Sequence, residues 1–251
     1  MAAAVAAVGV LGAIVGSFLN VVIHRLPERR SLVHPRSRCP DCRAQIASRD
    51  NIPVLSWMVL RGRCRSCGEP IPIRYPAIEA LTAAVFAGIA AARGVDSELA
   101  LLLPFAAVLI AVAAIDLEHR IVPNRIVAPA ALWALAAGAL LRGSELPGLA
   151  LAAALAFCLL LLVALAYPAG MGMGDVKLAG VMGLYLGAAV APALLSAFFA
   201  GSVIGIAMIA RHGAAARKLG VPFAPFLAGG GIVGVLFGPQ LVDLYVSAFL
   251  S

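Results

Sequence analysis

The stretch Leu99-Ala-Leu-Leu-Leu-Pro-Phe-Ala-Ala-Val-Leu-Ile-Ala-Val-Ala-Ala-Ile-Asp116 decides the fold class of this chain. Its apolar residues approach the length of a bilayer crossing, and the first charge, Asp116, closes the run. Asp175 stands in a similar place, at the end of Gly170-Met-Gly-Met-Gly-Asp175 and just before another apolar run. An ionised carboxylate near hydrocarbon costs roughly 2.5 to 3.5 kcal/mol even on lenient insertion scales. Two such residues at the ends of membrane segments therefore indicate a site.

The composition of the whole chain points the same way. Of its 251 residues, 63% are apolar and 12% are charged, and the mean hydropathy is +1.01, which excludes a soluble domain. The apolar windows predict an all-α polytopic membrane protein with about eight transmembrane helices. These spans are expected at 3–23, 77–92, 98–115, 126–141, 147–167, 176–191, 193–210 and 226–249. The stretch 176–210 is broken only around Ala191-Pro192, and a single kinked helix there would leave seven spans.

Charge predicts the orientation of these spans. Residues 24–75 hold eleven of the 19 Lys and Arg residues but only four of the 12 Asp and Glu residues, a net charge of +7, while the remainder balances. Because basic loops stay in the cytoplasm, eight spans place the N-terminus outside and 17 of the 19 basic residues inside. The turns 116–125, 168–177 and 211–225 are then cytoplasmic as well. Both aspartates are expected at the same, cytoplasmic membrane surface.

The predicted organisation has three parts. Residues 1–23 form a first transmembrane helix, which we expect to be retained because it lacks the basic start and the cleavage site of a signal peptide. Residues 24–76 form a small basic cytoplasmic domain, and residues 77–251 form a membrane domain of about seven helices that carries both aspartates.

Each aspartate also has a structural interpretation. Asp116 can be a solvated helix end, and Asp175 can be a helix N-cap. Capping does not explain the glycines at alternate positions before Asp175, which suit close approach of a substrate strand and positive φ angles. Two carboxylates that share a proton can act as the base and the acid of an aspartic hydrolase without a metal. We therefore expect Asp116 and Asp175 to be catalytic.

The basic loop contains two C-x2-C pairs, Cys39/Cys42 and Cys64/Cys67, with 21 residues between them. Four thiolates in two knuckles fit a tetrahedral structural zinc, although this spacing slightly exceeds the usual range. Two disulfides or a redox dithiol are the alternatives, and a reducing cytoplasm works against disulfides. The loop has few apolar side chains, so we expect zinc to staple it. Cys158 is expected to pack in an apolar span.

Taken together, these features resemble the type IV prepilin leader peptidases, and the resemblance covers nearly the whole chain. The matching segments are the Gly-x-Gly-Asp of 172–175, Ile115-Asp116 leading to Ile121–Asn124, the tetracysteine loop, Gly16–Asn20, His24–Pro27, Asn51–Pro53, Ser56-Trp57, Arg61–Cys64, Arg74–Pro76 with Glu79, and Pro222–Leu227. Asn124 departs from the Pro-Asp of many relatives, at a position outside the aspartate pair.

The resemblance implies a bifunctional enzyme of the bacterial inner membrane. Such enzymes cleave the basic leader of prepilins and of type II secretion pseudopilins after a Gly, then methylate the new N-terminal amine with S-adenosylmethionine. By position, Asp116 and Asp175 are the peptidase pair, Gly172, Gly174 and Lys177 belong to its active-site loop, and the four cysteines bind zinc in the loop associated with methylation. Membrane lipid is the other expected partner, and nucleic acid is not expected.

Several assignments stay open at this level. Glu79 either faces a polar cavity near the aspartates or caps its helix, Lys177 also suits a positive-inside anchor, and Gly180, Gly183 and Gly187 suit packing of the substrate helix. No glycine-rich motif locates the methyl-donor site. A leader peptidase without methylation, as in archaeal preflagellin processing, and a transporter are the alternative functions. The tetracysteine loop argues against the first, and the surface position of the carboxylates argues against the second.

Overall fold

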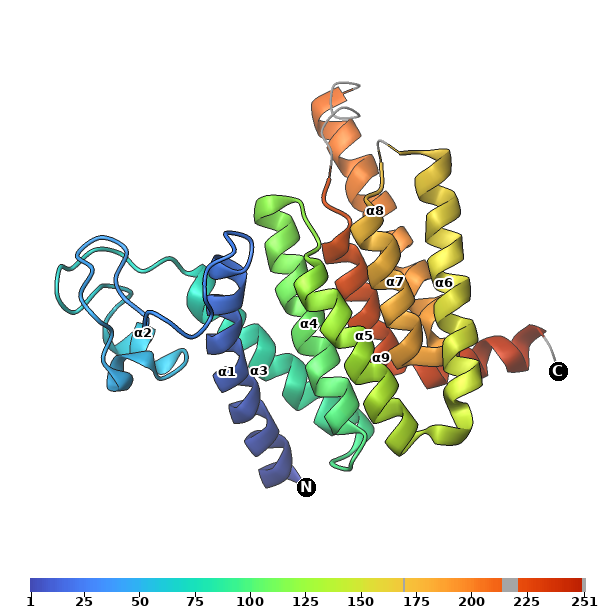
Figure 1. The fold of residues 1–251 in the computed structure, drawn as a ribbon, viewed down its shortest axis with the longest axis horizontal. Coiled ribbons are helices and arrows are strands. Elements are labelled where there is room, and N and C mark those ends of the chain that lie inside the picture. Colours follow the sequence, from blue (N-terminus) through green and yellow to red (C-terminus); the bar gives the residue numbers. More distant parts are fainter. Residues whose placement is uncertain (169, 214–220, 250–251) are drawn as a thin grey trace. The chain divides into compact units, whose positions relative to one another are not determined.

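The computed structural model describes residues 1–168, 170–213 and 221–249, which are almost entirely helical (Figure 1). The described residues contain no strand, only the isolated bridges Arg38↔Gln45 and Arg63↔Pro70. The chain divides into two compact units, Met1–Val95 and Asp96–Ser251. The predicted all-α membrane fold is confirmed. Two of the counted basic residues, Arg217 and Lys218, lie outside the described residues.

The N-terminal unit is built on two packed helices, α1 (Ala2–Arg25) and α3 (Arg74–Arg93). Gly12 and Gly16 lie four residues apart on the α1 face that meets α3. A Cβ at Gly12 would stand 2.7 Å from the Thr82 carbonyl oxygen, and one at Gly16 would stand 2.8 Å from the Glu79 Cα. Small residues at this spacing let two membrane helices approach to backbone contact, as in other helix pairs of the bilayer.

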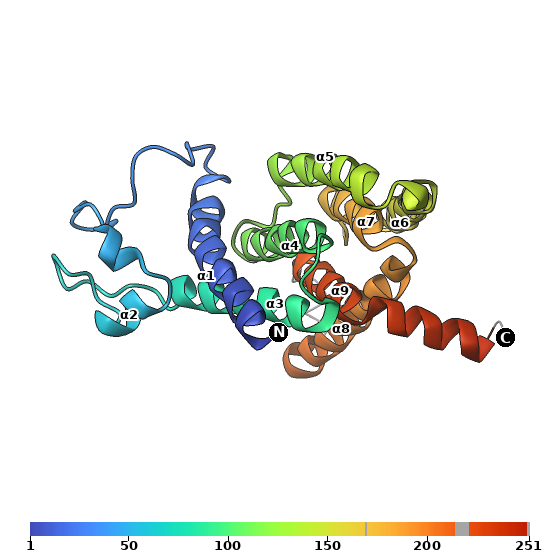
Figure 2. The same cartoon turned by 90° about the horizontal axis from the view of Figure 1, so that it is seen from below.

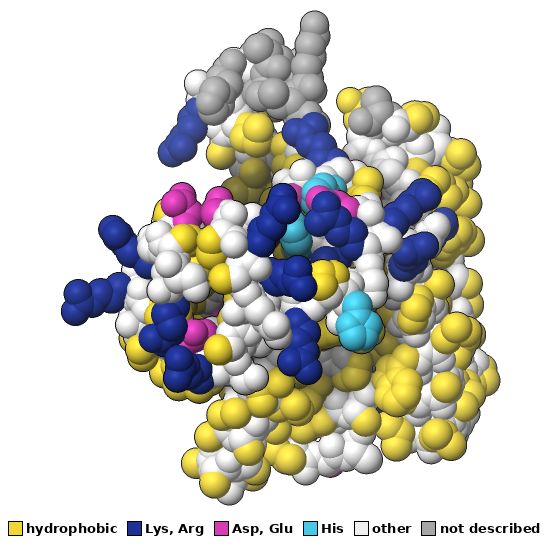
Figure 3. All heavy atoms as spheres, turned by 60° about the vertical axis from the view of Figure 1, so that its left-hand side comes forward, with side chains coloured by type: hydrophobic (Ala, Val, Ile, Leu, Met, Phe, Trp, Pro, Cys, Tyr) yellow, Lys and Arg dark blue, Asp and Glu magenta, His cyan; other side chains and the backbone are white. Residues whose placement is uncertain are grey.

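Between α1 and α3 the chain forms a compact loop region with the short helices η1 (Ser48–Asn51) and α2 (Leu55–Val59). The indole Nε1 of Trp57 donates to the Ile71 carbonyl oxygen at 3.0 Å. Gly62, at φ +68°, lies against this ring, where a Cβ would stand 2.9 Å from it. Several arginines of this region are exposed, and Figure 3 shows Lys and Arg side chains scattered over the face of the molecule that it draws.

The described residues of the C-terminal unit form a bundle of six long helices. These are α4 (Leu99–His119), α5 (Asn124–Leu141), α6 (Leu146–Ala166), α7 (Met173–Leu186), α8 (Val190–His212) and α9 (Ala224–Phe249). Of the membrane-length stretches, α4 is the most deeply buried, and it contacts α5, α7 and α9. Figure 2 shows α4 and α9 inside this unit, between α5 and α8. An apolar helix without a polar face suits such a central position.

Seven helical stretches among the described residues are long and apolar enough to cross a bilayer. The longest, Met173–Arg211, has 39 residues and would reach about 58 Å as one straight helix, far more than a hydrocarbon core. The structure instead reverses the chain at η3 (Gly187–Ala189), so that α7 and α8 run in opposite directions (Figure 1). This reversal agrees with the eight-helix prediction.

The break was predicted near Ala191-Pro192, and this position is wrong by a few residues. Gly187 adopts a φ of +57°, which ends α7 there. Pro192 lies instead in the first turn of α8, where a missing N–H leaves no helical hydrogen bond unmade.

Glycines on α7 serve internal packing rather than a substrate helix. A Cβ at Gly183 would stand 2.4 Å from the Ala153 Cα on α6, and one at Gly180 would stand 3.3 Å from Phe157 Cβ. The prediction of a substrate-facing glycine face on α7 is therefore wrong for these two residues. Cys158, also on α6, is exposed rather than packed in the protein interior.

Candidate active site and metal centre

Asp116 lies one turn before the end of α4 and is only 6% exposed. Its Oδ2 accepts a hydrogen bond from the Ala224 N–H at 3.1 Å. Ala224 is the first residue of α9, so this carboxylate meets the positive end of the α9 dipole. The Pro222–Leu227 segment therefore has a physical role: it begins a helix whose first N–H holds Asp116. Sequence reasoning missed this contact because the partner is a backbone group.

Asp175 lies in the first turn of α7 and is 8% exposed. Its Oδ2 accepts a hydrogen bond from the Gly172 N–H at 3.2 Å, which is half of a capping box. Its Oδ1 is buried and has no hydrogen-bond partner among the described residues. The N-cap of α7 is Gly172, so Asp175 is not itself the N-cap as predicted; one of its oxygens instead takes part in the capping box from the first turn. The second oxygen is an acceptor that the fold does not use, and such groups in proteins call for an explanation.

Asp116 is near the end of α4 and Asp175 near the start of α7, so both belong to the end of the C-terminal bundle where α4 ends and α7 and α9 begin; these helix ends are at the top of Figure 1. The three helices contact one another. Asp116 accepts a hydrogen bond from the first N–H of α9, and Asp175 lies in the first turn of α7, so a helix N-terminus favours negative charge on each carboxylate. Two carboxyl groups held this way can share one proton and act on a water molecule as base and acid.

The glycines before Asp175 have unequal roles. A Cβ at Gly174 would stand 2.6 Å from the Val122 Cβ, so Gly174 allows the start of α7 to touch the α4–α5 turn. Gly172 has a φ of −84°, and a Cβ there would make only an ordinary contact with Asp175 Oδ2 at 3.6 Å. Neither Gly172 nor Gly174 has a positive φ, so that expectation is wrong for these two residues. Close approach is the requirement that the structure supports, at Gly174.

Lys177 reaches back to the turn before α5. Its Nζ donates to the Asn124 Oδ1 at 3.2 Å, which links the first turns of α7 and α5 on the exposed side of the site. Asn124, the residue singled out from the sequence for its departure from Pro-Asp, is thus the hydrogen-bond partner of Lys177. Asn keeps the hydrogen bond, whereas Asp would add an opposite charge.

The four loop cysteines come together in the N-terminal unit. All four Sγ atoms lie within 4.8 Å of one another, with Cys39 and Cys67 at 3.8 Å and Cys42 and Cys64 at 4.0 Å. A tetrahedron with metal–sulfur bonds of about 2.3 Å has edges of about 3.8 Å. These distances match the donor arrangement of a four-cysteine metal site, and the 3.8 and 4.0 Å contacts each join one knuckle to the other. The arrangement supports one shared metal rather than a separate dithiol in each knuckle.

The two knuckles repeat one backbone design. Cys39 and Cys64 each accept a hydrogen bond at the carbonyl from the residue after the knuckle, Arg43 at 3.0 Å and Gly68 at 2.9 Å. Both of these residues have positive φ, +59° and +76°. A positive φ is strained for Arg43, whereas Gly68 adopts it without a Cβ clash. The residue type therefore agrees with the backbone geometry at Gly68, whereas nothing in the residue type of Arg43 indicates its positive φ.

Backbone N–H groups also donate hydrogen bonds to the sulfur atoms of the loop cysteines. N–H groups of Cys67 and Ser66 donate to the Cys64 thiol and lower its pKa to about 7. A backbone N–H at Glu69 favours the Cys67 thiolate, but burial and the neighbouring thiols outweigh it and raise the pKa of Cys67 to about 12. Four thiolates this close repel one another unless a cation lies between them. The donor set thus fits a divalent metal such as zinc.

Glu79 lies on α3 and lines a cavity of the N-terminal unit. Its Oε2 accepts a hydrogen bond from the Val54 N–H at 2.7 Å, which ties the start of α2 to α3. No side chain caps the N-terminus of α3, so the capping alternative for Glu79 is wrong.

Comparison with known proteins identifies relatives for both units. The family described as Bacterial Peptidase A24 N-terminal domain matches residues 10–92, and the Type IV leader peptidase family matches residues 103–210. Three similar curated proteins are each named prepilin leader peptidase/N-methyltransferase. The Bacillus subtilis (strain 168) protein is 36% identical over 96% of this chain and 98% of its own length. The Aeromonas hydrophila protein is 38% identical over 94% and 91%, and the Myxococcus xanthus (strain DK1622) protein is 39% identical over 83% and 64%. No solved structure matches the chain.

Proposed function

Because this chain belongs to the type IV leader peptidase family, we propose that Asp116 and Asp175 are the catalytic pair of a membrane aspartic peptidase. The activity is that of its relatives: removal of the leader from prepilins, followed by N-methylation of the new N-terminus. One observation carries the site assignment. Two buried carboxylates lie at the same end of a membrane bundle, and Asp175 keeps one oxygen without a partner among the described residues.

The geometry suggests how the pair works. One carboxylate, as a base, takes a proton from a water molecule, whose oxygen attacks the scissile carbonyl carbon. The other, protonated, donates a hydrogen bond to the carbonyl oxygen. Collapse of the tetrahedral intermediate breaks the C–N bond, and the departing amine takes up a proton. The N–H groups of Gly172 and Ala224 orient the two carboxylates throughout.

Peptide bonds in a helix are shielded by their own hydrogen bonds, so the substrate segment must be extended at the site. Gly172 leaves open space beside Asp175, since a Cβ there would meet only the carboxylate and the Gly174 nitrogen. This space suits an extended backbone next to the catalytic oxygen. We assign Gly172 to substrate approach, and Gly174 and Lys177 to positioning the first turn of α7.

The four-cysteine cluster holds zinc in this proposal. When bound, the metal supplies structural order to a loop region with little apolar core of its own. Cys39, Cys42, Cys64 and Cys67 are its ligands, and no step of peptide cleavage involves them.

The chain is a multi-pass protein of the bacterial inner membrane. We place its N-terminus outside, and the aspartates and the basic loop on the cytoplasmic side, from the concentration of positive charge in residues 24–75. Prepilin leaders are short basic segments before an apolar helix, so they stay on that side as well. Membrane lipid surrounds the bundle, and pseudopilins are further substrates.

The direct test of the bifunctional assignment is a reaction with purified full-length protein, a prepilin and methyl-labelled S-adenosylmethionine. Cleavage is followed by the mobility shift of the pilin, and methylation by label in its N-terminal peptide. We expect both products. Cleavage without label would reduce the assignment to a leader peptidase, and neither product with several prepilins would contradict it.

A further inference from the structure

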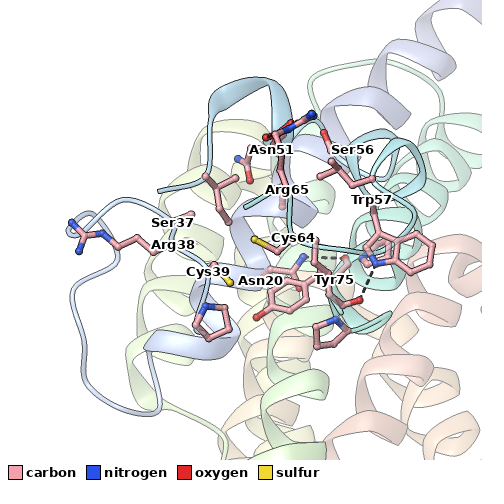
Figure 4. A pocket seen from close by; sticks show the side chains of 18 of the residues that line it. Asn20, Ser37, Arg38, Cys39, Asn51, Ser56, Trp57, Cys64, Arg65 and Tyr75 are labelled. Atoms are coloured by element: carbon pink, nitrogen blue, oxygen red, sulfur yellow. Dashed lines mark hydrogen bonds and ion pairs between the residues drawn. The ribbon is translucent and has the colours of Figure 1, made fainter. Parts of the chain in front are cut away.

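The N-terminal unit contains a cavity of about 560 Å³ between α1, the loop region and the start of α3. Figure 4 shows part of its lining, with Trp57 at the right, Cys39 further left, and Asn20, Cys64 and Tyr75 between them. Its volume falls within the range of small-molecule sites, roughly 300 to 1,000 Å³. The peptidase mechanism uses none of these residues.

Asn20 gives this cavity a polar anchor. Its side chain is 5% exposed, and its Nδ2 donates to the Tyr75 carbonyl oxygen at 3.1 Å, which fixes the orientation of the amide. Its Oδ1 is buried and has no hydrogen-bond partner among the described residues. A fixed, buried acceptor without a donor is costly to the fold, so it indicates a ligand that brings an N–H or O–H group.

The remaining lining offers three further kinds of contact. Trp57 presents a flat ring that is held in place through its bond to Ile71. Glu79 lines the cavity and uses one oxygen for the Val54 N–H, so the carboxylate retains acceptor capacity. Both acidic and basic side chains line the cavity, and one such pair, Asp50 and Arg65, is already joined by two hydrogen bonds of 2.6 and 2.8 Å.

We propose that this cavity is the binding site of the methyl donor, S-adenosylmethionine. The inference rests on the N-methylation assigned above, which requires a donor site that no sequence motif locates. The donor's amino and hydroxyl groups suit Asn20 Oδ1, its adenine suits the face of Trp57, and its cationic groups suit Glu79. Because Cys39 and Cys64 form part of the wall, the metal that they hold would shape the same cavity.

Methyl transfer needs no reactant other than the methyl donor and the cleaved pilin. The neutral amine of the cleaved pilin forms a bond to the donor's methyl carbon while the carbon–sulfur bond breaks. The electron pair of that bond stays on sulfur, so the product is the neutral thioether S-adenosylhomocysteine. The positive charge moves to the methylated amine, which releases a proton to water.

The test measures donor binding to the full-length protein in detergent, with no pilin present. Methyl-labelled S-adenosylmethionine is cross-linked by ultraviolet light, and the labelled peptides are mapped. Equilibrium dialysis then gives the affinity of the wild type, Asn20→Ala, Glu79→Gln and the control Thr82→Val. Thr82 is a matched control because it is buried at the α1–α3 contact, its hydroxyl donates within its own helix, and it does not line the cavity.

We expect the label within residues 14–79 and affinities about tenfold weaker for Asn20→Ala and Glu79→Gln, as loss of a hydrogen bond to a charged ligand predicts. Thr82→Val should bind like the wild type. If Asn20→Ala does not fold, Glu79→Gln decides, since Gln keeps an oxygen for the Val54 N–H.

Label within residues 96–249 would overturn the inference, and so would wild-type affinity in both cavity variants. If cleaved pilin is still methylated in that case, the N-methylation assignment stands and only the donor site is wrong. A wild-type protein that neither binds the donor nor methylates cleaved pilin would instead overturn N-methylation itself, and the donor site with it.

Discussion

Replacement of Gly174 by Ala should disable the peptidase through one contact. The added Cβ would stand 2.6 Å from the Val122 Cβ and 3.2 Å from its Cγ2, closer than side-chain carbons pack. Overpacking of this kind typically costs about 1 to 3 kcal/mol. The clash is relieved when the start of α7 moves away from the α4–α5 turn, and Asp175 moves with it. If the transition state for cleavage loses the same 1 to 3 kcal/mol of stabilisation, the cleavage rate falls by a factor of about 5 to 150.

The assay is a cleavage time course with a purified prepilin, together with thermal unfolding of each variant in detergent. Val122→Ala removes the Cγ atoms and leaves room for the turn to adjust, so the double variant Gly174→Ala/Val122→Ala should recover much of the lost rate. Gly172→Ala, whose Cβ would make only an ordinary contact at 3.6 Å, should keep its stability within about 0.5 kcal/mol. Wild-type cleavage by Gly174→Ala, or no recovery in the double variant, would refute the packing argument.

Two further perturbations address the metal and the bundle. Metal analysis of the purified wild type should find about one zinc per chain. Replacing Cys64 and Cys67 by Ser should remove the metal and most methyl transfer but leave measurable cleavage. Normal methylation by this variant without metal would contradict the structural role of the zinc. Gly183→Ala should lower the unfolding temperature, because its Cβ would stand 2.4 Å from the Ala153 Cα, whereas Gly205→Ala, which has no neighbour within 4 Å, should not lower it. Equal unfolding temperatures for these two glycine variants would argue against close α6–α7 packing.

Much of the fold was predictable because apolar run length determines where membrane helices form. The apolar runs predicted all the long helices to within a few residues. The number of spans between the turns that carry Asp116 and Asp175 then predicted both aspartates at the same end of the bundle. The break between α7 and α8 was misplaced because Pro192 is tolerated in a first helical turn, while Gly187 adopts a positive φ. Residue type alone does not distinguish these two effects.

The candidate site was predictable as residue types but not as contacts. Asp116, Asp175 and the four cysteines carry their chemistry in the side chain, so a pattern can reveal them. The Ala224 N–H that holds Asp116 belongs to the backbone and comes from 108 residues away, and a pattern cannot reveal it. The glycines of α7 were assigned to a substrate because small residues show only that something approaches closely.

The central claim is that Asp116 and Asp175 together cleave the leader, and substitution by Asn tests it most directly. Asn preserves the shape of each side chain and an oxygen for the Ala224 or Gly172 N–H, but it cannot share a proton. The measurement is the cleavage rate of Asp116→Asn and of Asp175→Asn, with methylation of a previously cleaved pilin as the control for folding. We expect no detectable cleavage and continued methylation in both variants. Substantial cleavage by either folded variant would remove that residue from the catalytic pair.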